Sequence, residues 1–132
     1  MFMTGPEIMR NARVNPDDIR EGETVVDTWR RKLKEAKMTG EEHYGKEAFE
    51  PGRTLRGYEL KKKGIGPKTS LESEAKKHGL PGFVSLENYG SHRYLIGGHH
   101  RVALSNEQFK SHIFPVKYFE SLGQAKQDPG YR

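Results

Sequence analysis

The chain of 132 residues contains no cysteine. This absence excludes disulfide bonds, cysteine-ligated zinc and thiol nucleophiles, although it does not indicate a cellular compartment. Long hydrophobic runs are missing as well, since the apolar stretches reach only a few residues and a membrane span needs roughly 18 or more. The N-terminal region includes Glu7, Asp17 and Asp18 and holds no apolar signal-peptide segment. We therefore expect a soluble, cytoplasmic protein without a membrane partner.

Apolar residues are scarce. They make up 33% of the chain, whereas ordinary globular domains contain roughly 45–50% with glycine included. The value of 33% does not include glycine, so counting the 15 glycines as apolar narrows this difference. Length and composition together predict one domain with a modest core, peripheral elements and considerable irregular surface.

Positive charge is concentrated in one segment. Residues 53–77 hold eight basic and three acidic side chains, a local excess that equals the net charge of +5 of the whole chain. Such a segment suits a polyanion, whose counterions it would displace, although solvated faces carry similar runs. The residues that we expect to contact nucleic acid are Arg53, Arg56, Lys61, Lys62, Lys63 and Lys68.

The N-terminal part changes character at residue 24. Residues 1–23 combine turn formers with scattered apolar residues, and we expect an arm or a packed irregular lead-in there. From Thr24 onward, apolar residues recur at spacings of three and four, which predicts a helix with one apolar stripe facing the core. Capping-box pairs predict two further helices, at residues 39–49 and 69–78. The residues of the apolar stripe are Val25, Val26, Trp29, Leu33 and Ala36.

A hairpin is expected closer to the C-terminus. Two β-prone runs, at residues 83–86 and 93–96, flank a turn around residues 88–90. A short helix from His99 to about Ser105 follows, and then a strand over residues 113–119. Because Pro115 has no N–H to donate, we expect it to begin that strand or to lie at a sheet edge. These elements indicate an α+β fold, a small mixed sheet with a β-hairpin and surrounding helices, with a helical N-terminal extension.

The sequence Gly97-Gly98-His99-His100-Arg101 joins the second hairpin strand to the short helix. Glycine lets the backbone approach a ligand closely, the first amides of a helix favour an anion, and arginine contacts phosphate in a bidentate manner. The motif therefore predicts a phosphate site. In the alternative interpretation, the histidines hydrogen-bond backbone groups and Arg101 pairs with an acidic neighbour. We expect no metal site, because adjacent helical histidines point about 100° apart.

This order of elements resembles the ParB/sulfiredoxin-like superfamily, in particular the ParB N-terminal or ParB-like nuclease domain. The resemblance covers about residues 69–119. It gives an expected ParB-like core at residues 53–120 that begins with the basic segment, an N-terminal arm and helical extension at residues 1–52, and a polar tail at residues 121–132. The matching pieces are His78-Gly79, residues 83–86, the glycine-histidine motif with Val102-Ala103, and Phe114-Pro115-Val116.

The resemblance implies that the five residues from Gly97 to Arg101 line a pocket for the phosphates of a nucleotide or nucleic acid. A nucleoside triphosphate, with or without Mg²⁺, is the expected cofactor. If a phosphoryl bond is cleaved, His99 or His100 would be the general acid or base, and Arg101 would stabilise charge on the phosphoryl oxygens. Two departures limit the comparison. Gly97 stands where many relatives have an acidic residue, and His99 stands where sulfiredoxins have the cysteine, which excludes their thiol chemistry.

Three functions are compatible with these observations. The first is a stand-alone ParB-like, nuclease-type domain that binds phosphate through the glycine-histidine motif, and that would be a nuclease or nucleotide hydrolase if it is an enzyme. The second is a non-catalytic DNA-binding protein that uses residues 53–77 and binds with a steep salt dependence. The third is a small phage-type protein that acts on a host protein.

Overall fold

The computed structural model describes residues 1–38 and 84–128. The helices expected at residues 39–49 and 69–78 lie outside this described part. The same holds for the basic segment 53–77 and for the expected boundary between residues 52 and 53.

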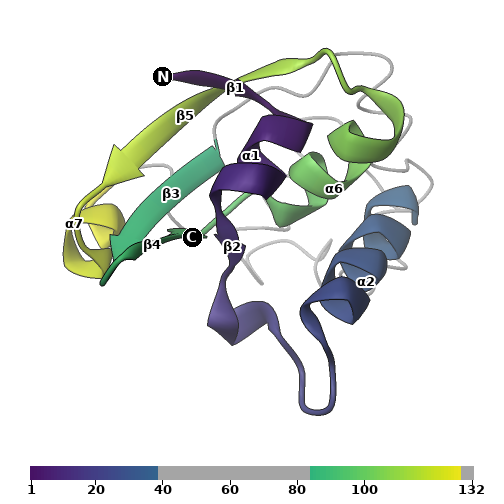
Figure 1. Ribbon diagram of the computed structural model, residues 1–132, viewed down its shortest axis with the longest axis horizontal. Helices are drawn as coiled ribbons and strands as arrows, with labels where there is room; N and C mark the ends of the chain where they lie inside the picture. The colour runs from purple at the N-terminus through teal and green to yellow at the C-terminus, as the bar shows by residue number, and fades with distance from the viewer. Residues whose placement is uncertain (39–83, 129–132) are drawn as a thin grey trace, which may run out of the picture.

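Five strands form one mixed sheet in the described part of the chain (Figure 1). β3 and β4 pair antiparallel around a turn at Gly90, which has a φ of 64°. β5 runs parallel to β3 and antiparallel to β1, while β2 runs parallel to β4. The expected small mixed sheet with a hairpin is confirmed. In the spatial order β1-β5-β3-β4-β2, the strands are β1 (Phe2–Thr4), β5 (Ile113–Phe119), β3 (Val84–Tyr89), β4 (His92–Leu95) and β2 (Arg13–Val14).

Helices in the described residues are α1 (Gly5–Asn11), α2 (Val25–Lys37), α6 (His99–Gln108) and α7 (Leu122–Lys126), and a 3₁₀ turn, η1 (Pro16–Asp18), precedes α2. α6 lies between α1 and α2 (Figure 1) and packs against both. α7 lies at the opposite end of the molecule and packs against β3 and β5. The fold is therefore α+β, as expected. None of these described helices combines the length and the apolar character that a membrane crossing requires.

The core lies between the sheet and the helices α1 and α6. Side chains alternate between the two faces of a strand, so every second residue of β3 and β5 points toward these helices. α1 and α6 meet them with their own apolar side chains. The largest fully buried hydrophobic residues are Phe114, Ile8, Leu86, Leu95, Leu104, Val84 and Val102.

Residues 1–23 differ from the irregular lead-in that we expected. They contribute α1 and the two edge strands of the sheet, β1 and β2. A capping box starts α1, because Thr4 Oγ1 accepts from Glu7 N at 3.3 Å while the Glu7 carboxylate accepts from Thr4. α1 then approaches α6 so closely that a Cβ on Gly5 would lie 2.6 Å from Ser105 Oγ. The two strands were missed because runs of two or three residues leave no periodic signal. The Thr4–Glu7 capping box was a sequence signal for α1 that the expectation did not use.

Pro115 neither begins its strand nor lies at a sheet edge. It is the third residue of β5, and β5 lies between β1 and β3. Val116 N donates to Met1 O at 2.8 Å, so the nitrogen of the preceding residue points away from β1. On the other side, the register with β3 begins at the pair of Val84 and Val116. The missing N–H therefore interrupts neither of the described ladders.

Helix α2 begins at the expected position, but its buried face is different. Val25 and Val26 are 51% and 57% exposed, so the expected stripe is wrong at its N-terminal end. Polar residues are buried in their place, because α2 packs against η1 and the first turn of α6 and finds charged partners there. The buried residues of α2 are Thr28, Lys32 and Ala36, with Trp29 and Leu33 packed at the margin of the core.

Candidate phosphate site at the start of helix α6

Helix α6 begins after Gly98, the second glycine of the motif. Gly98 has a φ of 83°, in the left-handed region that favours glycine, and it caps the helix without a side-chain hydrogen bond. A Cβ at this position would also lie 3.1 Å from Val84 Cγ2. Gly97 is different, because a Cβ there would meet nothing within 4 Å. The turn from β4 into α6 therefore requires glycine only at the second position.

His99, the first residue of α6, is buried, with 5% of its surface exposed. Its Nε2 accepts a hydrogen bond from the backbone N–H of Asn15 at 3.3 Å. Nδ1 therefore carries the proton of the neutral ring, and it lies 3.5 Å from Asp18 Oδ2. The ring packs near Trp29, with the two ring centroids 5.8 Å apart. His99 thus satisfies a backbone group, as the alternative interpretation of the motif expected.

The charge of His99 follows from this environment. Burial lowers its pKa to about 4, and the neighbouring Asp18 only partly opposes the effect. The ring is therefore uncharged around neutral pH. Since both ring nitrogens already face protein groups, His99 fixes the position of α6 against the segment before η1.

His100 and Arg101, the next two residues of α6, are more open to solvent. The His100 side chain is 20% exposed, and its Nε2 lies 3.5 Å from Glu35 Oε1 on α2. Arg101 is also partly buried and has an interaction partner. Both side chains lie in the first turn of α6, beside the contact with α2.

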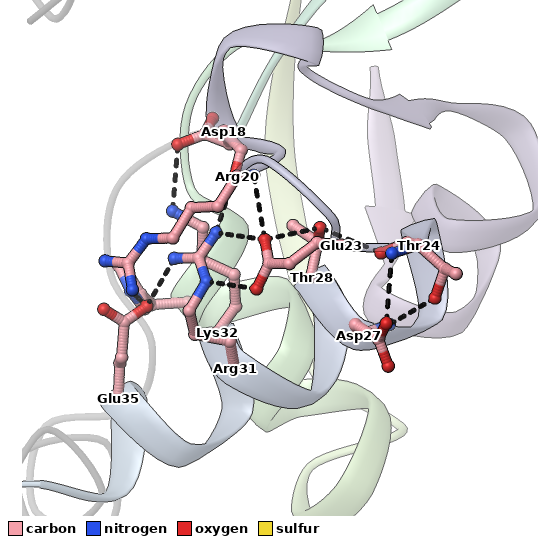
Figure 2. Close-up of polar contacts among 10 residues, drawn as sticks. Asp18, Arg20, Glu23, Thr24, Asp27, Thr28, Arg31, Lys32 and Glu35 are labelled. Atoms are coloured by element: carbon pink, nitrogen blue, oxygen red, sulfur yellow. Dashed lines mark hydrogen bonds and ion pairs between the residues drawn. The ribbon is translucent and has the colours of Figure 1, made fainter.

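A network of ion pairs connects α2 to η1 and the loop that follows it (Figure 2). Arg31 is at its centre, with Nε 2.8 Å from Glu23 Oε2 and Nη1 3.1 Å from Glu35 Oε1. Arg31 Nη2 also donates to the backbone carbonyl of Asp18. The hydrogen bond from Arg31 is the main reason that the pKa of Glu23 falls to about 2. These contacts hold the loop after η1 against the surface of α2.

A second ion pair joins Lys32 to Asp18, with Nζ 2.9 Å from Oδ1. The Lys32 side chain is 10% exposed and the Asp18 side chain 30%. Burial alone would raise the pKa of Asp18, but the hydrogen bond from Lys32 and the charge interaction with His99 bring it below its ordinary value. The Asp18 carboxylate therefore stays ionised and connects α2 to the first residue of α6.

Glu87 is a buried acid in a different place. It lies on β3 with 4% of its surface exposed, and its Oε1 has no hydrogen-bond partner in the described structure. Because side chains alternate along a strand, Glu87 points to the face opposite Leu86, away from α6. Burial raises the pKa of its carboxyl group. Glu87 is therefore not part of the α6 site.

The structure brings the predicted residues His99, His100 and Arg101 together with groups that the sequence did not indicate. Lys32 shares one helix face with buried neighbours at spacings of four, but no sequence signal marks a lysine as buried. The predicted nucleic-acid contacts at residues 53–68 lie outside the described residues. The groups that the sequence did not indicate are Asn15, Asp18, Lys32 and Glu35.

Residues 1–38 and 84–128 hold no cluster of three or more histidine, cysteine or acidic side chains arranged for a metal ion. Comparisons with family models, with curated proteins and with solved structures found no match for the chain. A functional assignment therefore depends on the geometry and chemistry at the start of α6.

Proposed function

We propose that the chain binds a phosphate group of a nucleotide or nucleic acid at the start of α6. One observation carries the proposal. This helix of ten residues begins after Gly98 with no side-chain cap and no acidic residue in its first turn. The first N–H groups of a helix have no partner within it, and together with the helix dipole they favour an anion. The helix dipole at this end of α6 would favour a bound phosphate.

Basic side chains near the same point support the proposal. His100 and Arg101 stand in the first turn of α6, and Lys32 lies near His99, since both contact the carboxylate of Asp18. Arg101 would supply the bidentate contacts that phosphate oxygens accept. The similarity of the motif to ParB-like domains supports the same class of ligand.

The two histidines have different roles in this proposal. His99 holds the backbone of Asn15 and has a pKa of about 4, so it positions the helix. His100 is the histidine that would contact the ligand, and it would be the general acid or base in any hydrolysis. Binding has more support than bond cleavage. Nuclease or nucleotide-hydrolase activity, a nucleoside triphosphate cofactor with or without Mg²⁺, and a cytoplasmic location stay predictions.

The two alternative functions also stay predictions. DNA binding through residues 53–77 concerns a segment outside the described residues. A protein partner is favoured by an apolar area on β1 and β5, where Phe2 is 74% and Ile113 57% exposed. Both side chains lie on one face, since Phe2 pairs with Pro115 and Thr4 pairs with Ile113. Phe2→Ser would weaken binding to such a partner and leave phosphate binding unchanged.

A calorimetric titration with inorganic pyrophosphate and adenosine triphosphate, repeated at several salt concentrations, tests the proposal. Arg101→Ala should weaken binding about tenfold or more, because a hydrogen bond to a charged group contributes about 1.5–3 kcal/mol. Arg10→Ala is the matched control, since it removes the same charge from an exposed position in the last turn of α1. Equal losses in the two variants would contradict the proposal, as would the absence of binding by the wild type.

A further inference from the structure

Glu87 carries a buried carboxyl oxygen that the phosphate site does not use. Only 4% of the residue is exposed, and its Oε1 has no hydrogen-bond partner in the described structure. A buried polar group without a hydrogen bond costs free energy, and the cost is larger when the group is charged. Groups of this kind are rare in folded proteins, and each needs a physical reason.

Helix α7 lies over the face of the sheet to which Glu87 points. Glu87 on β3 pairs with Phe119 on β5, and Lys117 lies two residues earlier on β5, so all three side chains point to one face. Lys117 Nζ lies 2.9 Å from Oδ1 of Asp128, which follows α7 closely. The helix packs against both strands (Figure 1), and its Ala125 is completely buried. Glu87 is therefore buried at the contact between α7 and the sheet.

The attachment of α7 is small. The helix has five residues, and an isolated helix of this length is not stable in water. The Lys117 side chain is 46% exposed, so its ion pair with Asp128 contributes little to stability. Small units of this kind open at a lower cost in free energy than the core does. α7 can therefore leave the sheet while the core stays folded.

The charge of Glu87 changes the cost of this contact. Burial raises the pKa of Glu87 above its ordinary value of 4.5, and the positive charge of Lys126 on α7 partly opposes the effect. Glu87 therefore holds its proton more tightly beneath α7 than it would in water. The other described titratable side chains on this face of the neighbouring elements are Tyr94 and His92 of β4, Lys117 of β5 and Asp128 after α7.

We propose that α7 is a pH-sensitive cover over this face of the sheet, and that it opens when the Glu87 carboxyl group loses its proton. The neutral carboxyl group lies beneath α7 at a small cost. The carboxylate gains full hydration only when α7 moves away, because its Oε1 has no partner inside. Acid therefore closes the cover and a rise in pH opens it. Opening would expose Ser85, which is buried on the same face, and it does not depend on the phosphate site.

Hydrogen exchange of backbone amides in the wild type measures the opening. The N–H of Ala125 donates to Ser121 O at 3.1 Å, and the N–H of Asp128 donates to Ala125 O at 3.0 Å. From pH 4 to pH 8, the protection factors of these two amides, corrected for the intrinsic exchange rate, should fall by at most about tenfold per pH unit, since one proton is released. The amide of Val102 in α6 should show no such fall. Protection of α7 that does not depend on pH would overturn the proposal.

Three variants separate the charge of Glu87 from other effects. In Glu87→Gln, which stays neutral, the α7 amides should keep their acid protection at every pH. Glu120→Gln removes the same charge from an exposed position just before α7 and should keep the wild-type fall. Lys126→Met removes the charge that opposes the carboxylate, so it should lower protection at pH 8 and change it little at pH 4. The same fall in Glu87→Gln as in the wild type would overturn the proposal.

A further measurement needs no substitution and does not depend on how well the variants fold. In wild-type protein with ¹³C-labelled glutamate, the carboxyl group of Glu87 should titrate with a pKa above 4.5. The fall in α7 protection should level off as the pH passes this pKa, because Glu87 is then ionised in the closed state as well. Titration of Glu87 at its ordinary pKa, with α7 still protected, would show that the buried acid does not control the cover.

Discussion

Breaking the ion pair between Lys32 and Asp18 from its two ends should destabilise the protein by unequal amounts. Asp18→Asn leaves the ammonium group of Lys32, which is only 10% exposed, beside a neutral partner. An uncompensated charge costs about 3–5 kcal/mol when its burial is complete. Lys32 keeps some solvent contact, and asparagine still accepts a hydrogen bond. We therefore expect Asp18→Asn to lower the free energy of unfolding by about 2–3 kcal/mol.

The opposite substitution should cost less. Lys32→Met leaves the Asp18 carboxylate, which is 30% exposed and keeps part of its hydration. Methionine fills much of the volume of the lysine stem and packs against the apolar neighbours of α2. We therefore expect Lys32→Met to lower the free energy of unfolding by about 1 kcal/mol or less. The double variant, which carries neither charge, should be about as stable as Lys32→Met alone.

Urea denaturation at pH 7, followed by circular dichroism, measures all three free energies of unfolding and the coupling between the two sites. The pair of Lys37 and Glu107 is the control, because its side chains are 37% and 43% exposed. Breaking that pair from either end should cost less than about 1 kcal/mol. Equal losses for Asp18→Asn and Lys32→Met, or a larger loss for Lys32→Met, would refute the reasoning.

Three further predictions concern single side chains. Gly98→Ala should lower the free energy of unfolding in urea by about 2 kcal/mol, since a left-handed backbone costs other residues about 1–2 kcal/mol and the new Cβ would crowd Val84; an equal loss for Gly97→Ala would contradict this. Glu87→Gln should raise the free energy of unfolding at pH 7 by about 1 kcal/mol. Burial raises the pKa of Glu87, so the folded state favours the protonated acid, and the gain should vanish in urea titrations at acidic pH. The pKa of His99 falls from 6.5 to about 4 on folding. The unfolded chain therefore takes up this proton first, and thermal melts should show about 3 kcal/mol of stability lost as the pH falls from 6.5 to 4. This dependence should weaken in His99→Gln, and a wild-type profile that is flat over this range would show that the ring is not held uncharged.

The hairpin, α2, α6 and β5 could be predicted from the sequence because each leaves a local signal. Two β-prone runs around a turn mark β3 and β4, and apolar residues at spacings of three and four after Thr24 mark α2. The edge strands β1 and β2 could not be predicted, since they have three and two residues and form only through pairing with β5 and β4. The expected position of Pro115 was wrong, because a strand inside the sheet can contain proline when the proline nitrogen faces no carbonyl of a paired strand, and the sequence does not show which way the nitrogen faces.

The junction between β4 and α6 was predictable in position, but the contacts around it were not. The motif from Gly97 to Arg101 correctly marked the junction of a strand and a helix. The burial of His99 depends on Asn15 and Trp29, which are far away in the sequence. The burial of Lys32 depends on Asp18 in the same way. A hydrophobic pattern carries no information about a buried polar group whose partner comes from another segment, so these contacts become visible only in the folded chain.

The central claim, that the start of α6 binds phosphate, is tested most directly by amide chemical shifts. In a ¹H–¹⁵N titration of the wild type with adenosine 5′-monophosphate, the backbone N–H groups of His99, His100 and Arg101 should shift most, because they would donate to the ligand. In the Arg101→Ala variant at equal ligand concentration, the chemical shifts of the amides at positions 99, 100 and 101 should not change. Shifts that spare these three amides and fall within residues 53–77 would contradict the claim.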